Sequence, residues 1–287
     1  MNKLTVSFVL PSGVPCVCTE LYGDHYDILT SKRFKGEDMM LEFILSLMVS
    51  VGSKTFKKNA EFHAENKKFI QAMRAKDKEH ILATVRQASM DYEKSFEFIY
   101  KYQDSNGANR EKLLKVTLND SDSEATLEHL DNLGRIYGVE HKDFYKELNK
   151  DGTFYTTPSI DRATEYADLP PFYLVELPKI GKTVRVDYLT GKGELFLSKQ
   201  NKLELSVNSL ISARFPQYKD GESWIHLRLG DLPMKDLSIL RKEIKKREGA
   251  VDLELTFNNP DKESDERKVT KNLITETAFF FPSGAVG

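Results

Sequence analysis

The chain has 287 residues, 40% of them hydrophobic and 30% charged, which at about twice the usual domain size predicts a globular protein with more than one core. Its 42 basic and 44 acidic residues leave a formal net charge of -2, so no overall field attracts nucleic acid or a membrane surface. The longest apolar stretch, residues 39–51, contains Glu42 and is too short to span a bilayer. We therefore expect no nucleic-acid or membrane partner.

A β-hairpin is predicted at the start of the chain. Apolar side chains alternate over residues 4–8, and Pro-Ser-Gly-Val-Pro at 11–15 turns the chain into a second strand. Cys16 and Cys18 share one face of that strand, and their spacing does not suit a disulfide. We expect two reduced thiols, which together with the lack of a signal-peptide cleavage site predicts a cytoplasmic protein.

Two helices and a second hairpin complete the first part of the chain. Apolar residues recur at three- and four-residue spacing over 39–48 and 62–73, which predicts an amphipathic helix in each. Side chains alternate over 96–102 and again over 113–118, with a polar turn between them. We expect these elements to form a first α+β module, residues 1–119.

An acidic segment, residues 120–171, follows this module. Its first part has capping residues and an apolar stripe, which predict an amphipathic helix, and its last part has the glycine and prolines of an extended connector. We expect a helical linker that either fixes the orientation of its neighbours or docks a partner helix.

The rest of the chain repeats the first part. Residues 8–32 align with 175–199 after one insertion before Gly181, and 80–114 align with 235–269 without a gap, which pairs Arg86 with Arg241. A duplicated unit needs two copies of a shape and seldom two copies of an active site. The repeat therefore favours scaffolding or binding over catalysis.

The second module, residues 172–287, is predicted to contain the same kinds of element. It begins with a hairpin, and Asp231 is the predicted N-cap of a helix that ends at Gly249. A second hairpin is predicted from a strand over 251–257, a polar turn and a return strand over 269–274. The predicted fold class is α+β, with two tandem related modules, each with β-hairpins packed on short helices, joined by a helical linker.

Titratable residues are densest at Asp24, His25 and Asp27. A hydrolase or nuclease that uses these three residues is one alternative, but a solvated turn is favoured because no activated nucleophile accompanies them. No two histidines have the spacing that holds zinc on a helix, and Gly191-Lys-Gly lacks the spacing of a phosphate-binding loop. We expect no catalytic residue, no metal site, no cofactor and no small-molecule substrate.

Three phenylalanines, Phe279 to Phe281, stand together near the end of the chain. Leaving each in water would forfeit about 1.5 to 3 kcal/mol, so we expect them to pack inside their own module or against a partner. On a strand they would alternate between two faces, with the middle Phe280 directed away from the core.

Short motifs at both ends of the chain resemble a known family. They are Leu-Pro-Ser-Gly at 10–13, Asp-x-x-x-Leu-Arg at 236–241, the segment at 249–252 and Phe-Phe-Phe-Pro-Ser at 279–283. In this order they are similar to the baseplate hub proteins and hub-assembly chaperones of contractile-tailed bacteriophages of the T-even type. Many similar members carry Cys-x-x-Cys pairs in the turn after the central or final strand; this chain has no cysteine there, so the resemblance implies no metal.

The resemblance implies a non-enzymatic structural or assembly component of a phage tail baseplate hub. Its partners would be other tail and baseplate proteins, and it would lie in the host cytoplasm during assembly and in the virion if it is a permanent part. The alternatives are a transient hub assembly chaperone absent from the mature virion and a soluble regulatory binding module. The expected partner-binding residues are Leu10, Pro11, Phe279, Phe280, Phe281 and Pro282.

Overall fold

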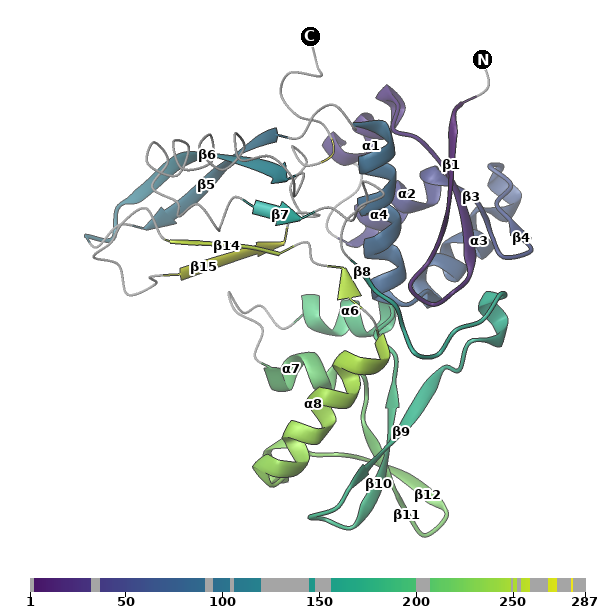
Figure 1. Ribbon diagram of the computed structural model, residues 1–287, viewed down its shortest axis with the longest axis vertical. Helices are drawn as coiled ribbons and strands as arrows, with labels where there is room; N and C mark the ends of the chain where they lie inside the picture. The colour runs from purple at the N-terminus through teal and green to yellow at the C-terminus, as the bar shows by residue number, and fades with distance from the viewer. Residues whose placement is uncertain are drawn as a thin grey trace. The chain divides into compact units, whose positions relative to one another are not determined.

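The protein is described here by a computed structural model (Figure 1). The structure describes residues 3–31, 37–90, 95–103, 106–119, 145–147, 156–199, 207–248, 250–251, 254–258, 268–272 and 280. It is a mixed α+β fold with two antiparallel four-stranded sheets, which confirms the predicted fold class at that level. No helix among these residues is both long and apolar enough to cross a membrane.

The first four-stranded sheet has the order β1-β2-β3-β4. Its strands are β1 (Thr5–Val9), β2 (Pro15–Thr19), β3 (Met48–Val51) and β4 (Lys54–Thr55), and the helices α1 (Gly23–Thr30) and α2 (Glu37–Leu47) lie between β2 and β3 in the chain. The predicted first hairpin is confirmed, with Phe8 opposite Cys16. Cys16 and Cys18 are free, buried thiols whose Sγ atoms lie 3.7 Å apart, as expected for reduced cysteines on one strand face.

The second four-stranded sheet has the order β12-β11-β10-β9. Its strands are β9 (Phe172–Leu177), β10 (Lys182–Asp187), β11 (Gln217–Asp220) and β12 (Ser223–His226), and the helices α6 (Gly191–Ser198) and α7 (Val207–Ser212) lie between β10 and β11 in the chain. Both four-stranded sheets therefore consist of two hairpins with two helices between the second and third strands. Each is a continuous meander in which neighbours in sequence pair.

Three longer helices follow the two sheets. They are α3 (Ala60–Ala72) and α4 (Ala75–Ser89) after the first sheet and α8 (Met234–Glu248) after the second. The apolar stripe of α8, Leu237, Leu240 and Ile244, packs in one core with the inward side chains of β9 and β10, such as Val175 and Val184. The predicted amphipathic helices over 39–48 and 62–73 correspond to α2 and α3 and are confirmed.

The predicted N-cap of α8 is wrong by two residues. Asp231 belongs to a short 3-10 turn, η3 (Leu229–Asp231), and α8 begins at Met234. The carbonyl of Pro233 accepts the first helical hydrogen bonds, from the N–H groups of Asp236 and Leu237. The proline is compatible with this position because it has no N–H to satisfy at a helix start.

The remaining strands form smaller sheets. They are β5 (Ser95–Gln103), β6 (Asn109–Asn119) and β7 (Tyr145–Glu147) in one sheet, β14 (Glu254–Asn258) with β15 (Lys268–Asn272), and β13 (Ala250–Val251) with β8 (Thr156–Thr157). The strands predicted over 96–102 and 113–118 are confirmed by β5 and β6. The hairpin predicted from 251–257 to 269–274 is confirmed by the pairing of β14 with β15, but Val251 belongs to a separate strand, β13, with another partner.

Contacts divide the chain into two compact units. Unit 1 comprises residues 1–19, 32–81 and 156–250, and unit 2 comprises 20–31, 82–155 and 251–287. Both four-stranded sheets belong to unit 1, and the β5–β6 and β14–β15 hairpins belong to unit 2. The predicted division into residues 1–119, 120–171 and 172–287 stays a prediction, and much of 120–155 lies outside the described residues.

The two fifteen-residue helices α4 and α8 share a buried aspartate at the same position. Asp77 and Asp236 are each the third residue, each is buried, and each accepts backbone hydrogen bonds from the turn of the first hairpin of its sheet. If the two aspartates are aligned, Arg86 corresponds to Lys245, four residues from the Arg241 of the gapless sequence alignment, which stays a prediction. A shift of about one helical turn leaves an apolar stripe in place, so sequence periodicity does not reveal it.

Candidate functional site

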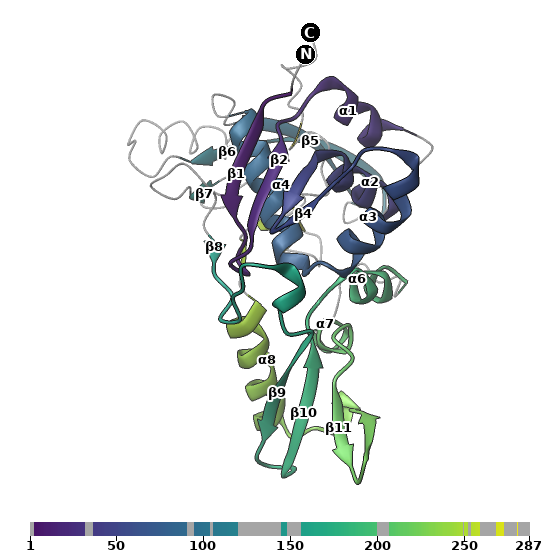
Figure 2. The same ribbon diagram turned by 90° about the vertical axis from the view of Figure 1, so that its right-hand side faces the viewer.

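An irregular segment, residues 159–170, which includes the 3-10 helix η2 (Tyr166–Asp168), crosses the hairpin turns of the first four-stranded sheet, and we call it the strap (Figure 2). The N–H of Ser159 donates to the carbonyl of Pro11 at 2.9 Å, and the N–H of Ala163 donates to that of Ser12 at 3.0 Å. The strap therefore adds backbone hydrogen bonds at the turn between β1 and β2, where a strand end would otherwise leave polar groups unpaired.

The strap also contacts the turn between β3 and β4. The Glu165 carboxylate accepts hydrogen bonds from the N–H and the hydroxyl of Ser53, at 2.9 and 3.0 Å. Because the acceptor is a carboxylate and both donors belong to one residue, this is a charge-assisted contact. The strap thus joins the two hairpin turns of this sheet.

Glycine lets the strap approach both turns closely. Gly13 has φ +89° and Gly52 has φ +54°, in the region where side chains are strained. A Cβ atom on Gly13 would lie 3.1 Å from the Cβ of Arg162, and one on Gly52 would lie within 3.2 Å of the carbonyl of Thr164. These two glycines are required both by the turn and by the segment that covers it.

Arg74 holds the strap from the side of α4. Its guanidinium is buried and donates to Ser159 Oγ at 3.2 Å and to the carbonyls of Asp161 and Pro170 at 3.3 and 3.1 Å. It also stacks on the ring of Tyr188, 3.5 Å from the ring centroid. One buried cation therefore bridges both ends of the strap and the end of the second sheet.

Asp77 and Tyr166 complete the contact, and we call Arg74, Asp77 and Tyr166 the clasp. The Tyr166 hydroxyl donates to Asp77 Oδ2 at 2.8 Å and accepts from the N–H of Arg74 at 2.6 Å. Asp77 Oδ1 accepts from the N–H of Ser12 at 3.1 Å. The clasp thus links the hairpin turn, the start of α4 and the strap through groups that satisfy one another.

Burial sets the protonation of the clasp. Burial raises the pKa of Asp77, although the hydrogen bonds from Tyr166 and Ser12 and the charge of Arg74 act in the opposite direction. Burial together with the nearby Asp77 charge raises the pKa of Tyr166 well above its ordinary value. The phenol therefore remains a donor, and the arrangement is chemically suited to holding segments together.

The Asp77→Asn variant is expected to have a flatter dependence of stability on pH. Because the carboxyl pKa is raised in the folded protein, wild type loses unfolding free energy as pH rises from the ordinary pKa of about 3.9 through the raised one, by about 1.4 kcal/mol for each pH unit between them. Asparagine keeps the acceptor for Ser12 but has no proton to lose. Urea unfolding between pH 4 and 7 should show wild type losing stability relative to the variant, and the opposite trend would contradict this.

The cluster at Asp24, His25 and Asp27 lies in α1, so the predicted solvated turn is wrong. His25 is 1% exposed, and its Nδ1 atom accepts from the N–H of Tyr22 at 2.9 Å. Asp24 lies 3.8 Å from the same Nδ1 atom. A ring nitrogen that accepts from the backbone does not also donate to a carboxylate, so this geometry gives no aspartate-histidine relay.

The structure describes some of the predicted partner-binding residues and not others. Leu10 is 2% exposed and Pro11 is buried where the strap covers the hairpin turn. Phe280 is 1% exposed and helical, so it does not alternate on a strand as considered above, and what it contacts stays a prediction. Phe279, Phe281 and Pro282 lie outside the described residues. Their part in partner binding stays a prediction.

Sequence reasoning missed an apolar surface on the second sheet. The strand register places Leu174, Arg185 and Trp224 on the face opposite α8, which we call the outer face. Leu174 is 51% exposed and Trp224 is 40% exposed. The signals were the lone tryptophan in a polar stretch and a leucine in step with Glu176.

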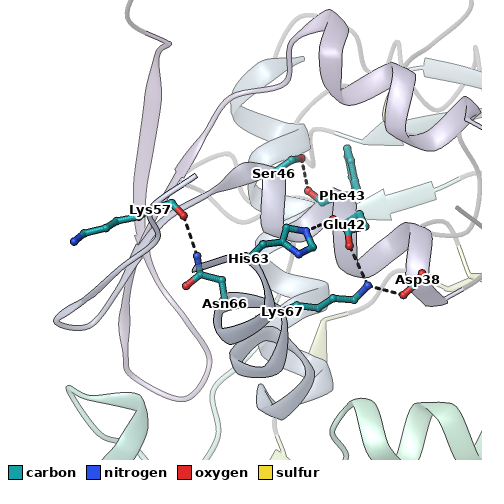
Figure 3. Close-up of polar contacts among 8 residues, drawn as sticks. All are labelled: Asp38, Glu42, Phe43, Ser46, Lys57, His63, Asn66 and Lys67. Atoms are coloured by element: carbon teal, nitrogen blue, oxygen red, sulfur yellow. Dashed lines mark hydrogen bonds and ion pairs between the residues drawn. The ribbon is translucent and has the colours of Figure 1, made fainter. Parts of the chain in front are cut away.

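A surface ion cluster joins α2 to α3 (Figure 3). Glu42 accepts from His63 Nε2 and from Lys67 Nζ, each at 2.9 Å, and Lys67 also pairs with Asp38 at 2.7 Å. Partial burial opposes ionisation, but the hydrogen bonds from His63 and Lys67 outweigh it and lower the pKa of Glu42. Within the described part of the chain no group of acidic, histidine or cysteine side chains is arranged to hold a metal.

The clasp and the strap thus hold one sheet, while the outer face of the other is uncovered by the described residues. The chain matches no protein-family model, no curated protein and no solved structure.

Proposed function

We propose that the protein is a non-enzymatic scaffold built from two tandem copies of one module. The shared order of strands and helices, the eight-residue helices α1 and α6 that both begin at glycine, and the paired Asp77 and Asp236 support a duplication. The linker, residues 120–171, ends in the strap, which rests on the first module and leads into β9. Its role is to fix the first sheet and the second in one unit.

The scaffold acts through contacts with other proteins, and the outer face carries this proposal. Tryptophan and arginine are the residues that most often dominate binding energy at protein interfaces. Trp224 stands opposite Lys219 on β11, while Arg185 stands opposite Leu174 and stacks on Phe172 with 4.2 Å to the ring centroid. An apolar centre with cations beside it is typical of an interface core and its rim.

We further propose that the partners are proteins of a contractile phage tail, with the chain a structural or assembly component of the baseplate hub. The motifs at 10–13 and 279–283 support this by their resemblance. In the structure the first motif forms the buried turn under the strap, where Gly13 has positive φ, so its residues are constrained by the fold. The phenylalanine motif and the outer face would then supply the contacts.

The Trp224→Ala variant is expected to lose association with the hub. Truncation of a central tryptophan costs about 2 kcal/mol, or roughly thirtyfold in affinity. The side chain is 40% exposed, so unfolding free energy should change by less than about 1 kcal/mol. Sedimentation of the purified chain with purified tail proteins measures the first quantity, and urea unfolding measures the second.

The matched control is Leu4→Ala, at an apolar side chain 64% exposed beside the first sheet. It should retain association. Absence of association between the wild-type chain and every hub component would overturn the proposal, as would an equal loss in both variants. Mass spectrometry of purified virions then separates a permanent component, which is present, from a transient assembly chaperone, which is not.

A further inference from the structure

The hairpin turns of the two four-stranded sheets differ in what covers them. Gly13 and Gly52 of the first sheet contact the strap, as described above. Gly181 and Gly221 occupy the turns of the second sheet with φ +62° and +59°, and no described atom lies within 4 Å of a Cβ built on either. Figures 1 and 2 show these two turns projecting at the lower end of the second sheet.

A hollow lies beside the open turns. It encloses about 210 Å³ and is lined by Ile180, Lys182, Tyr218, Asp220 and Leu227. We call this hollow, with the turn glycines Gly181 and Gly221, the second seat. Its lining combines apolar and aromatic side chains with one cation and one carboxylate.

A buried aspartate supports the first hairpin turn of each four-stranded sheet, so what distinguishes the two sheets is the strap. Asp77 accepts from Ser12 N–H under the first turn, and Asp236 accepts from the N–H groups of Lys179 and Ile180 under the second, at 3.1 and 3.0 Å. Both turns are therefore preorganised by a buried carboxylate, which lowers the cost of binding a further segment. The first sheet shows what such a segment is: an irregular peptide that places a carboxylate at the turn between β3 and β4.

The charged side chains of the second seat can also accept a segment that carries a carboxylate. Lys182 is paired with Asp220 only at 3.9 Å, and their side chains are 41% and 61% exposed. Its Nζ lies 5.3 Å from the Tyr218 ring centroid. Exposed pairs of this length contribute little, so an incoming carboxylate can take the lysine at small cost.

We propose that the second seat binds an irregular, acidic segment of a partner protein, as the first sheet holds the strap. This rests on the duplication and on the scaffold function proposed above. The strap of a second copy is not the occupant, because residues 159–170 are held by Arg74 and by the turns of their own first sheet. The partner therefore supplies a free segment that carries a glutamate or aspartate.

The probe is a synthetic peptide of residues 157–170 of this chain, titrated into the full-length isotope-labelled protein and followed by NMR. We expect saturable shifts of the Gly181 and Gly221 amides with a dissociation constant below about 1 mM, since the peptide lacks the high effective concentration of the tethered strap. Lys182→Glu should weaken binding at least about tenfold, as should a peptide with glutamine at position 165. The matched control, Lys219→Glu on the adjacent strand, should change affinity less than about twofold.

Three results would overturn the proposal. They are no saturable shift at either amide at about 1 mM peptide, shifts confined to Gly13 and Gly52 through exchange with the strap, and equal losses for Lys182→Glu and Lys219→Glu. If the peptide does not bind but the chain still associates with tail proteins through Trp224, only the proposal for the second seat is contradicted. If the chain does not associate with tail proteins, the proposed scaffold function is contradicted, whereas the result of the peptide titration is unaffected.

Discussion

Arg74→Met is expected to lower the free energy of unfolding by about 3 to 5 kcal/mol, because it removes a buried charge from a network that stays buried. The guanidinium is 5% exposed and donates to three acceptors on the strap. Methionine fills much of the volume but leaves Ser159 Oγ and two carbonyls with fewer donors. Each buried group left without a partner costs about 1 to 3 kcal/mol.

Urea unfolding followed by circular dichroism measures this loss, and hydrogen exchange at Ser159 and Ala163 locates it. Arg74→Lys should recover only part of the stability, since an ammonium does not reproduce the planar fork. The control is Arg185→Met, whose side chain is 31% exposed and paired with Asp187 at 3.1 Å; it should cost less than about 1 kcal/mol. A stability of Arg74→Met within about 1 kcal/mol of wild type would show that the strap is held mainly by its backbone contacts.

The local elements of the fold were predictable because their signals are local. Alternation over residues 4–8 gave β1, and three- and four-residue spacing over 39–48 gave α2. The same periodicity leaves the alignment of α4 with α8 undecided by one turn, since residues one turn apart carry the same apolar face. Asp77 and Asp236 favour one of these alignments only through their contacts with the hairpin turns.

The strap was predictable as an extended connector but not as a cover for the first sheet. Its composition indicates an irregular segment, whereas its partners Pro11, Ser12 and Ser53 lie more than a hundred residues away in the chain. Gly13 and Gly52 are ordinary turn glycines in the sequence, and only the close approach of Arg162 and Thr164 shows a second constraint. Contacts of such long separation leave no periodic signal.

The partner-binding prediction failed to find the outer face for a related reason. The prediction named Leu10 and Pro11 because they lie in a short motif, but both are buried in the turn of the first hairpin. Trp224 and Leu174 share a face only once the register of β9 to β12 is known. A one-residue change of register would place them on opposite faces, so composition alone does not assemble that surface.

Gly193→Ala is expected to lower the free energy of unfolding by about 3 kcal/mol, because the added methyl group would clash with its neighbours. Gly193 is the third residue of α6 and is buried. A Cβ there would lie 2.3 Å from the carbonyl oxygen of Ala213 and 2.7 Å from a methyl group of Leu189. The backbone at Ala213 does not yield easily, since the neighbouring Arg214 is held by Glu248 through two short hydrogen bonds, at 2.5 and 2.7 Å.

The matched control is Gly23→Ala, at the first residue of the corresponding eight-residue helix α1. No described atom lies within 4 Å of a Cβ at Gly23, so alanine should be neutral or stabilise by up to about 1 kcal/mol. The third residue of α1 is His25, a large buried side chain, so this helical position is not intrinsically closed to side chains. Urea unfolding of both variants tests whether the approach of Ala213 closes it in α6; equal stabilities of Gly193→Ala and Gly23→Ala would show that it does not.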